Sequence, residues 1–262
     1  MRRSLRSAVH ASAAVLACST LALAQSDFQW RGPLGPGQTV EIKGVNGDVR
    51  AVPSSGGDVQ VTATRTARRS NPADVRIEVV PHAGGVTICA VYPDVPDREP
   101  NTCEPGSGGR SNTRNNDVVV QFIVQVPPGI GFVGRTVNGS VRAELLQGDV
   151  EGYTVNGSVT LATAGLVRAS TVNGSISATM GRADWNDGAN FRTVNGDITL
   201  KMPSVLNADL RADTVNGSIS TDFPITVTGR VTPRRLAGTV GSGGRELSLS
   251  TVNGSIQLLK SQ

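Results

Sequence analysis

The residues whose types and spacing best suit chemistry lie in one insertion between repeated segments, residues 181–189. Asp184 and Asp187 flank Trp185 there, so one loop combines two acids, an aromatic ring and glycines. Glycoside hydrolysis needs two carboxyl groups facing each other across a cleft, about 5–9.5 Å apart. Neighbours on one short loop rarely achieve this, and Asp and Asn also cap backbone amides in turns. We therefore expect a turn here and keep the loop as a secondary candidate site.

Other catalytic sets are incomplete. Outside residues 1–24 the sequence has one histidine, His82, which any Ser-His-Asp triad would have to use, and no Gly-x-Ser-x-Gly segment. Asp48 and Asp197 are positions for calcium, but the Gly-Gly-x-Gly-x-Asp pattern that binds it is absent. No glycine pattern for phosphate or dinucleotide binding precedes a helical segment. The sequence predicts no catalytic residue, no metal site and no cofactor, and hence no enzyme.

Residues 1–24 have the features of an export signal. Arg2, Arg3 and Arg6 precede an apolar run that ends in an Ala-x-Ala cleavage site before Gln25. The alternative is a lipoprotein acylated at Cys18, for which Leu16 is a poor fit. The apolar run is too short for a membrane span. We expect an exported protein in the periplasm, at the outer membrane or on the cell surface.

Charge and cysteines fit that location. Without residues 1–24, which hold three arginines and no acids, the net charge falls from +4 to +1, which gives no case for nucleic-acid binding. Cys89 and Cys103 are then the remaining cysteines, and an oxidising compartment favours a disulfide between them. Zinc is the alternative, but no histidine is near enough in sequence to complete a site.

A repeated unit, Thr-Val-Asn-Gly-Ser/Asp-Ile/Val, dominates the second half of the chain. From Asn138 the asparagines are spaced by 18, 17, 22, 21 and 37 residues, and the last interval suggests a degenerate copy near residues 238–241. Such periods are typical of repeat architectures in which each copy buries its apolar face against the next. The repeated asparagines are Asn46, Asn138, Asn156, Asn173, Asn195, Asn216 and Asn253.

Two β structures compete for this unit. Asn-Gly is a strong signal for a two-residue hairpin, but it can also lie within a strand that stacks in parallel on its neighbours. Every copy has Val before the asparagine and Val or Ile three residues after it, as in Val172 and Ile176. Side chains four residues apart share a face of a continuous strand, so we expect both in the core. This favours an all-β fold, a parallel β-solenoid or β-helix-like stack, with asparagine ladders between coils. The final copy, ending at Lys260, is expected to cap the stack.

The N-terminal portion is also β, but less regular. We divide the chain into a signal peptide (1–24), an N-terminal β region with a disulfide-tethered loop (25–133) and a serial repeat region (134–262). No clear linker separates the last two, which favours one continuous domain. The expected strands of the N-terminal region are Thr39–Lys43, Asp58–Thr64, Val75–Val80, Val86–Val91 and Val118–Val126.

A signal peptide, a strand ending in Val-Pro-Pro-Gly (126–129) and serial Thr-Val-Asn-Gly units occur in this order. In this the chain resembles the bacterial putative adhesin domain family, over about residues 40–259. The resemblance implies a β-solenoid-like fold and a cell-envelope location, and it brings no catalytic residues.

The leading hypothesis is a non-catalytic envelope adhesin or scaffold whose partner is a cell-surface or envelope protein or glycan. The alternatives are an envelope polysaccharide-acting enzyme and a structural or envelope-stress protein without ligand. The sequence does not define the oligomeric state.

Overall fold

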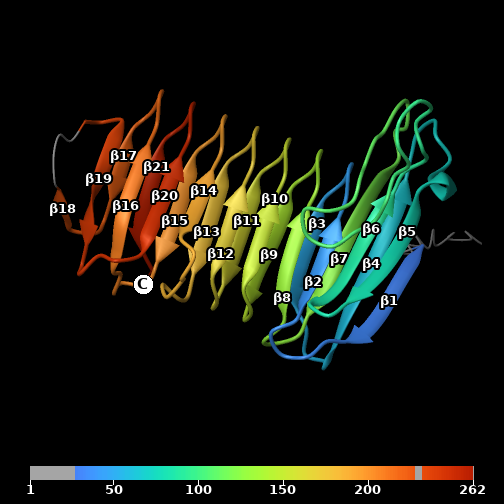
Figure 1. The fold of residues 1–262 in the computed structure, drawn as a ribbon, viewed down its shortest axis with the longest axis horizontal. Coiled ribbons are helices and arrows are strands. Elements are labelled where there is room, and N and C mark those ends of the chain that lie inside the picture. Colours follow the sequence, from blue (N-terminus) through green and yellow to red (C-terminus); the bar gives the residue numbers. More distant parts are fainter. Residues whose placement is uncertain (1–26, 228–231, 262) are drawn as a thin grey trace, which may run out of the picture.

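The computed structural model describes residues 27–227 and 232–261, in which the chain forms an elongated stack of strands (Figure 1). The predicted signal peptide and Cys18 lie outside these residues. Two sheets face each other along the stack, and their buried side chains form one continuous hydrophobic core. The predicted all-β solenoid is confirmed. Among the described residues no helix is long and apolar enough to cross a membrane.

Sheet A contains ten strands. In spatial order they are β1 (Phe28–Pro33), β4 (Asp58–Thr66), β7 (Val119–Val126), β3 (Val49–Pro53), β9 (Val141–Leu146), β11 (Val159–Thr163), β13 (Ile176–Met180), β15 (Ile198–Met202), β21 (Ile256–Lys260) and β17 (Ile219–Thr221).

Sheet B contains eleven strands. In spatial order they are β18 (Ile225–Val227), β19 (Arg235–Val240), β16 (Ala208–Asp213), β20 (Glu246–Ser250), β14 (Ala189–Arg192), β12 (Val167–Ser170), β10 (Val150–Tyr153), β8 (Gly131–Arg135), β2 (Thr39–Lys43), β6 (Gly85–Val91) and β5 (Arg76–His82). A short 3-10 turn, η1 (Pro72–Asp74), precedes β5. The division drawn at residues 133 and 134 falls inside β8, and both sheets run across it.

Each Thr-Val-Asn-Gly unit is the corner where the chain passes from sheet B to sheet A. The unit around Asn173, for example, joins β12 to β13, and its strands pair in parallel with those of the coils on either side. Successive asparagines are themselves joined by parallel bridges. Parallel neighbours exclude the hairpin alternative, in which the two strands flanking Asn-Gly would pair antiparallel.

The expectation that both Val172 and Ile176 face the core is wrong. Ile176 is buried, but Val172 is 39% exposed and Thr171 is only 2% exposed. The physical reason is the corner: the chain changes sheets at Asn-Gly, so the alternation of a single strand does not carry through it. The same inversion exposes Val137, Val155, Val215 and Val252, while every corner threonine from Thr136 to Thr251 is buried.

The corner glycines are required by close backbone contact between coils. A Cβ on Gly157 would lie closer than 3.0 Å to the carbonyl of Gly139, and one on Gly174 would meet the carbonyl of Gly157 in the same way. Positive φ explains the glycine only at Gly47 (φ 123) and Gly196 (φ 156). The threonine of each corner completes this contact, because the Thr171 hydroxyl donates to the Gly157 carbonyl at 2.9 Å.

The N-terminal end of the stack is closed by antiparallel strands. β4 pairs with β7 and β1 with β4 in sheet A, while β5 pairs with β6 in sheet B. Pro81 lies in β5, the edge strand, where it removes a backbone donor. These strands replace the repeating coil because residues 54–84 carry no Thr-Val-Asn-Gly corner.

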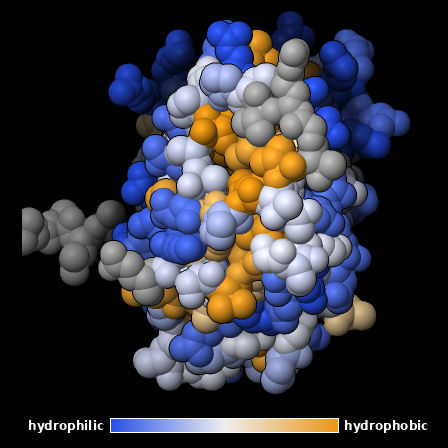
Figure 2. Space-filling model, turned by 90° about the vertical axis from the view of Figure 1, so that its left-hand side faces the viewer, coloured by the Kyte–Doolittle hydropathy of each residue, from blue (hydrophilic) through white to orange (hydrophobic). Residues whose placement is uncertain are grey.

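Two expectations about the C-terminal end are wrong. Residues 238–241 are not a degenerate coil, since β19 runs antiparallel to β16 and the chain leaves it through a turn. The final coil does not cap the stack either: β20 and β21 insert between the coils of Asn195 and Asn216. The end is formed instead by the coil of Asn216 and by β18 and β19, and Figure 2 shows a stripe of apolar side chains between polar margins on it.

We expect Gly157→Ala to lower the free energy of unfolding by about 1–3 kcal/mol, because the added methyl group forces two coils apart. Chemical denaturation followed by circular dichroism measures this change. Gly57→Ala is the control, since a Cβ there meets nothing within 4 Å, and its effect should stay within about 0.5 kcal/mol. Equal stability of the two variants would contradict the close-contact explanation.

We expect Thr171→Val to lower the free energy of unfolding by about 1 kcal/mol, because the Gly157 carbonyl loses its hydroxyl donor in a partly buried place. The same substitution at Thr179, on the outer face of β13, should be nearly neutral. Unfolding curves of both variants test this, and an unchanged midpoint for Thr171→Val would count against a role for the hydroxyl.

Candidate functional site

The loop of Asp184, Trp185 and Asp187 does not assemble an acid–base pair. Arg182 binds both Asp184 oxygens at 2.9 Å, and these hydrogen bonds hold the pKa of the Asp184 carboxyl below its usual value. A general acid requires the opposite shift. Trp185 is 3% exposed and donates its indole N–H to the Glu246 carbonyl at 2.8 Å. The ring therefore belongs to the core and offers no face to a ligand.

The corners of successive coils lie side by side and form one face of the stack, which we call the corner surface. The repeated asparagines form one continuous amide ladder on it. Each side-chain NH₂ donates to the side-chain oxygen of the neighbouring asparagine at 2.7–2.8 Å, as from Asn156 to Asn138. Asn253 lies between Asn195 and Asn216 in this ladder, because the last coil is inserted. At the other end Asn46 donates to the Val118 carbonyl at 3.4 Å. The amides are thus structural, although all the ladder asparagines except Asn46 remain exposed.

A row of valines runs beside the ladder, and we call it the valine ridge. Its members directly precede the ladder asparagines in adjacent coils, so neighbouring valines are one strand spacing apart, about 4.8 Å. Five are 37–54% exposed and Val194 is half-buried. Val45, at the same position of the first coil, is buried instead. The ridge consists of Val137, Val155, Val172, Val194, Val252 and Val215.

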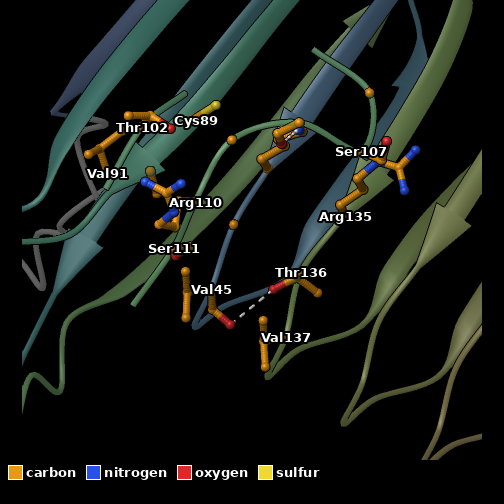
Figure 3. A pocket seen from close by; sticks show the side chains of 16 residues that line it. Val45, Cys89, Val91, Thr102, Ser107, Arg110, Ser111, Arg135, Thr136 and Val137 are labelled. Atoms are coloured by element: carbon orange, nitrogen blue, oxygen red, sulfur yellow. Dashed lines mark hydrogen bonds between the residues drawn. The ribbon is translucent and has the colours of Figure 1, made fainter. Parts of the chain in front are cut away.

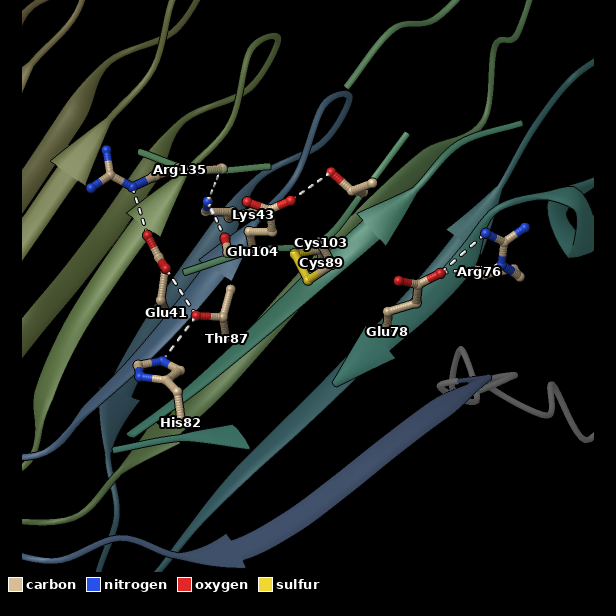
Figure 4. The surroundings of a disulfide bond; sticks show 12 residues. Glu41, Lys43, Arg76, Glu78, His82, Thr87, Cys89, Cys103, Glu104 and Arg135 are labelled. Carbon is tan, nitrogen blue, oxygen red and sulfur yellow. Dashed lines mark hydrogen bonds and ion pairs between the residues drawn. A yellow bond between two sulfur atoms is a disulfide. The ribbon is translucent and has the colours of Figure 1, made fainter. Parts of the chain in front are cut away.

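The segment between β6 and β7 packs over the outer face of sheet B at the N-terminal end of this ridge (Figure 4). Cys89 of β6 and Cys103 of the segment form a disulfide with 5.7 Å between their Cα atoms. Lys43 of β2 donates to the carbonyl oxygens of Glu104 and Gly108 at 2.5 and 2.8 Å. Burial lowers the pKa of this lysine. Covalent and charge-assisted contacts together fix residues 103–108 on the sheet.

A buried carboxylate gives the same segment a third attachment. Glu41 is 5% exposed and accepts hydrogen bonds from the Gly106 amide, the Thr87 hydroxyl and the Arg135 Nε. The Thr87 hydroxyl donates its proton to Glu41, so it can only accept in its 3.2 Å contact with His82. The Nε2 of His82 is therefore the donor of that contact. Thr87 is fully buried. It therefore has no access to a substrate, and this His-Thr-Glu chain is structural.

The polar chain continues across sheet B. The Arg135 guanidinium lies 4.2 Å from the centre of the Tyr153 ring, and the Tyr153 hydroxyl donates to Glu151, which also pairs with Arg168. Burial, reinforced by the Glu151 charge, raises the pKa of Tyr153 to about 12. Tyr153 therefore stays protonated at neutral pH and acts as a fixed donor and stacking surface.

A pocket of about 270 Å³ lies between this segment and the edge of the corner surface (Figure 3). Lys43, Arg110 and Arg135 line it, and none of the residues that line it is acidic. Val45, Val91 and Val137 supply apolar walls, and Ser107 and Ser111 add hydroxyl groups. In Figure 3, Arg110 and Arg135 lie on opposite sides, with Val45 and Val137 together at one margin.

No pattern in the sequence points to this pocket. Its walls come from residues 43–45, 89–91, 102–111 and 135–137, which no local pattern connects. The one available signal was the predicted disulfide, which ties Cys103 to a strand and so places the glycine-rich segment on the sheet.

Comparison with solved structures gives two matches of low identity. A crystal structure of a putative cell adhesion protein from Clostridium sporogenes ATCC 15579 has a TM-score of 0.45 and 9% identity, covering 89% of this chain and 99% of that one. A putative adhesin from Bacteroides fragilis NCTC 9343 has a TM-score of 0.27 and 11% identity, with coverages of 89% and 96%. No curated protein matches in sequence.

A family model matches most of this chain. The family described as Toastrack DUF4097 matches residues 35–259, from the first coil to the end of the inserted one. This range agrees with the resemblance to an adhesin-like β-repeat domain of unassigned function. The chain therefore belongs to the Toastrack DUF4097 family.

Proposed function

We propose that this chain is a non-catalytic, exported cell-envelope protein that acts as an adhesin-like or scaffolding module through its regular corner surface. The valine ridge is the observation that carries the proposal. Its side chains point away from the core, so packing does not require them to be apolar. Contiguous exposed apolar surface on a monomer commonly marks an interaction site.

The mechanism is the summation of weak contacts. One exposed valine gains little on burial, but a row at a fixed spacing engages an extended partner at several points at once. The amide ladder keeps the row straight, because each asparagine bonds to the next coil. The partner is a cell-surface or envelope protein or glycan.

Two further features support export. Residues 1–24 have the order of a secretion signal, and the Cys89–Cys103 disulfide suits an oxidising compartment. A structural or envelope-stress role without ligand is the competing function, and it predicts no binding by the ridge.

We expect the exported protein to begin at Gln25, because cleavage follows the Ala-x-Ala sequence, and to carry one intact disulfide. Mass spectrometry of the periplasmic and membrane fractions, with and without reduction, measures both. A lipid-modified mass beginning at Cys18 would replace this assignment by the lipoprotein alternative, and an unprocessed cytoplasmic chain would refute export.

We expect the double variant Val155→Ser/Val172→Ser to bind isolated envelope fragments about tenfold more weakly than the unaltered protein. Loss of two apolar contacts of roughly 1 kcal/mol each is sufficient for such a change. A pull-down with quantified depletion gives the affinity.

The matched control is Leu145→Ser/Val205→Ser, which removes two apolar side chains that are 77% and 78% exposed but lie outside the ridge. This control should bind normally. If both double variants bind alike, or if the unaltered protein binds no fragment, the ridge is not an interaction surface.

A further inference from the structure

The pocket beneath residues 102–111 has the properties of a second, separate binding site. It shares only Val137 with the valine ridge. Its roof, residues 102–111, is held by the disulfide, by Lys43 and by Glu41. A wall fixed in advance loses little conformational entropy when a ligand binds.

The lining has an excess of hydrogen-bond donors. The carbonyl oxygens of Glu104 and Gly108 are taken up by Lys43, and the Thr136 hydroxyl donates to Gly47. Among the described residues, the hydroxyl groups of Ser107 and Ser111 have no hydrogen-bond partner. A donor-rich wall favours a ligand that brings acceptors, and Arg110 favours a negatively charged one.

Acids outside the lining offset two of the three lining cations and leave Arg110 as the one with an exposed, exchangeable partner. Glu41 pairs with Arg135 at 2.8 Å and so offsets that cation, and Glu41 and Glu104 both act on Lys43. The lining cation that an anionic ligand can engage is therefore Arg110. Glu99 pairs with Arg110 at 2.6 Å, but the two side chains are 72% and 47% exposed. An ion pair so exposed contributes little, so an incoming carboxylate can take the place of Glu99.

We propose that this pocket binds a carboxylate carried on a small aliphatic body. Arg110 takes the carboxylate in exchange for Glu99, the adjacent Ser111 hydroxyl donates to it, and Val45, Val91 and Val137 contact the aliphatic part. The C-terminal residue of a polypeptide supplies both parts. A uronic acid supplies the carboxylate without the aliphatic part, so it tests the role of the valines.

The test measures binding of N-acetylvaline, its C-terminal amide and glucuronate to the full-length processed protein by NMR chemical-shift titration. We expect N-acetylvaline to bind at least tenfold more tightly than the amide, with shifts at residues 102–111. Binding of glucuronate in preference to N-acetylvaline would overturn the assignment of the three valines to an aliphatic part. Equal binding of acid and amide, or no binding of either carboxylate at millimolar concentration, overturns the proposal.

Two variants separate recognition from a structural role of the Arg110–Glu99 pair. Arg110→Gln should weaken N-acetylvaline binding at least tenfold, whereas Glu99→Gln should strengthen it about threefold by removing the competing carboxylate. Both changes break the same ion pair, so a structural role would move binding in one direction for both, and that result refutes the assignment. Arg114→Gln, an exposed arginine of the same segment outside this pocket, should leave binding unchanged.

The proposals for the valine ridge and for the pocket can be refuted separately. Val155→Ser/Val172→Ser should bind N-acetylvaline normally, since neither residue lines the pocket. Loss of envelope binding in that variant therefore says nothing against the carboxylate site, and loss of carboxylate binding in Arg110→Gln says nothing against the ridge.

Discussion

The structure depends on the close contact of one glycine with the next at every corner. Because no side chain fits between the Gly157 and Gly139 backbones, the coils approach closely enough for parallel pairing to continue through the corner. The Thr171 hydroxyl then satisfies the carbonyl that this contact buries. The valine between threonine and asparagine is left on the outside, and the asparagine lies directly over its neighbour. One steric condition thus accounts for the buried threonines, the valine ridge and the amide ladder.

A stack built on this contact must also end, and its two ends differ. At the N-terminal end antiparallel strands, with Pro81 in one edge, replace the coil. At the other end the edge strands β17 and β18 have only three residues each, and short edge strands limit pairing with other chains. The last coil is protected further, because it sits between two others and has neighbours on both sides. The number of coils, and with it the length of the valine ridge, is therefore limited at both ends.

The pocket arises where the regular repeat is interrupted. The coil of β6 and β7 has no Thr-Val-Asn-Gly corner, and a long segment takes its place. That segment folds back over sheet B and forms one wall of the pocket, which Val45 also lines. Repetition thus provides an extended surface, and the interruption of repetition provides a concave site at one end of it.

The sequence alone determined the β class, the parallel stacking, the asparagine ladder and the disulfide, because each rests on a local pattern or on a single pair of cysteines. The exposure of Val172 and the burial of Thr171 were decided by the corner, which breaks the side-chain alternation on which the prediction relied. The insertion of the last coil between Asn195 and Asn216 was decided by tertiary pairing, since all copies carry nearly the same stacking surface and sequence order does not select among them. The pocket was likewise a product of the fold, because Arg110 joins Arg135 and Val45 in its lining only after the segment has docked.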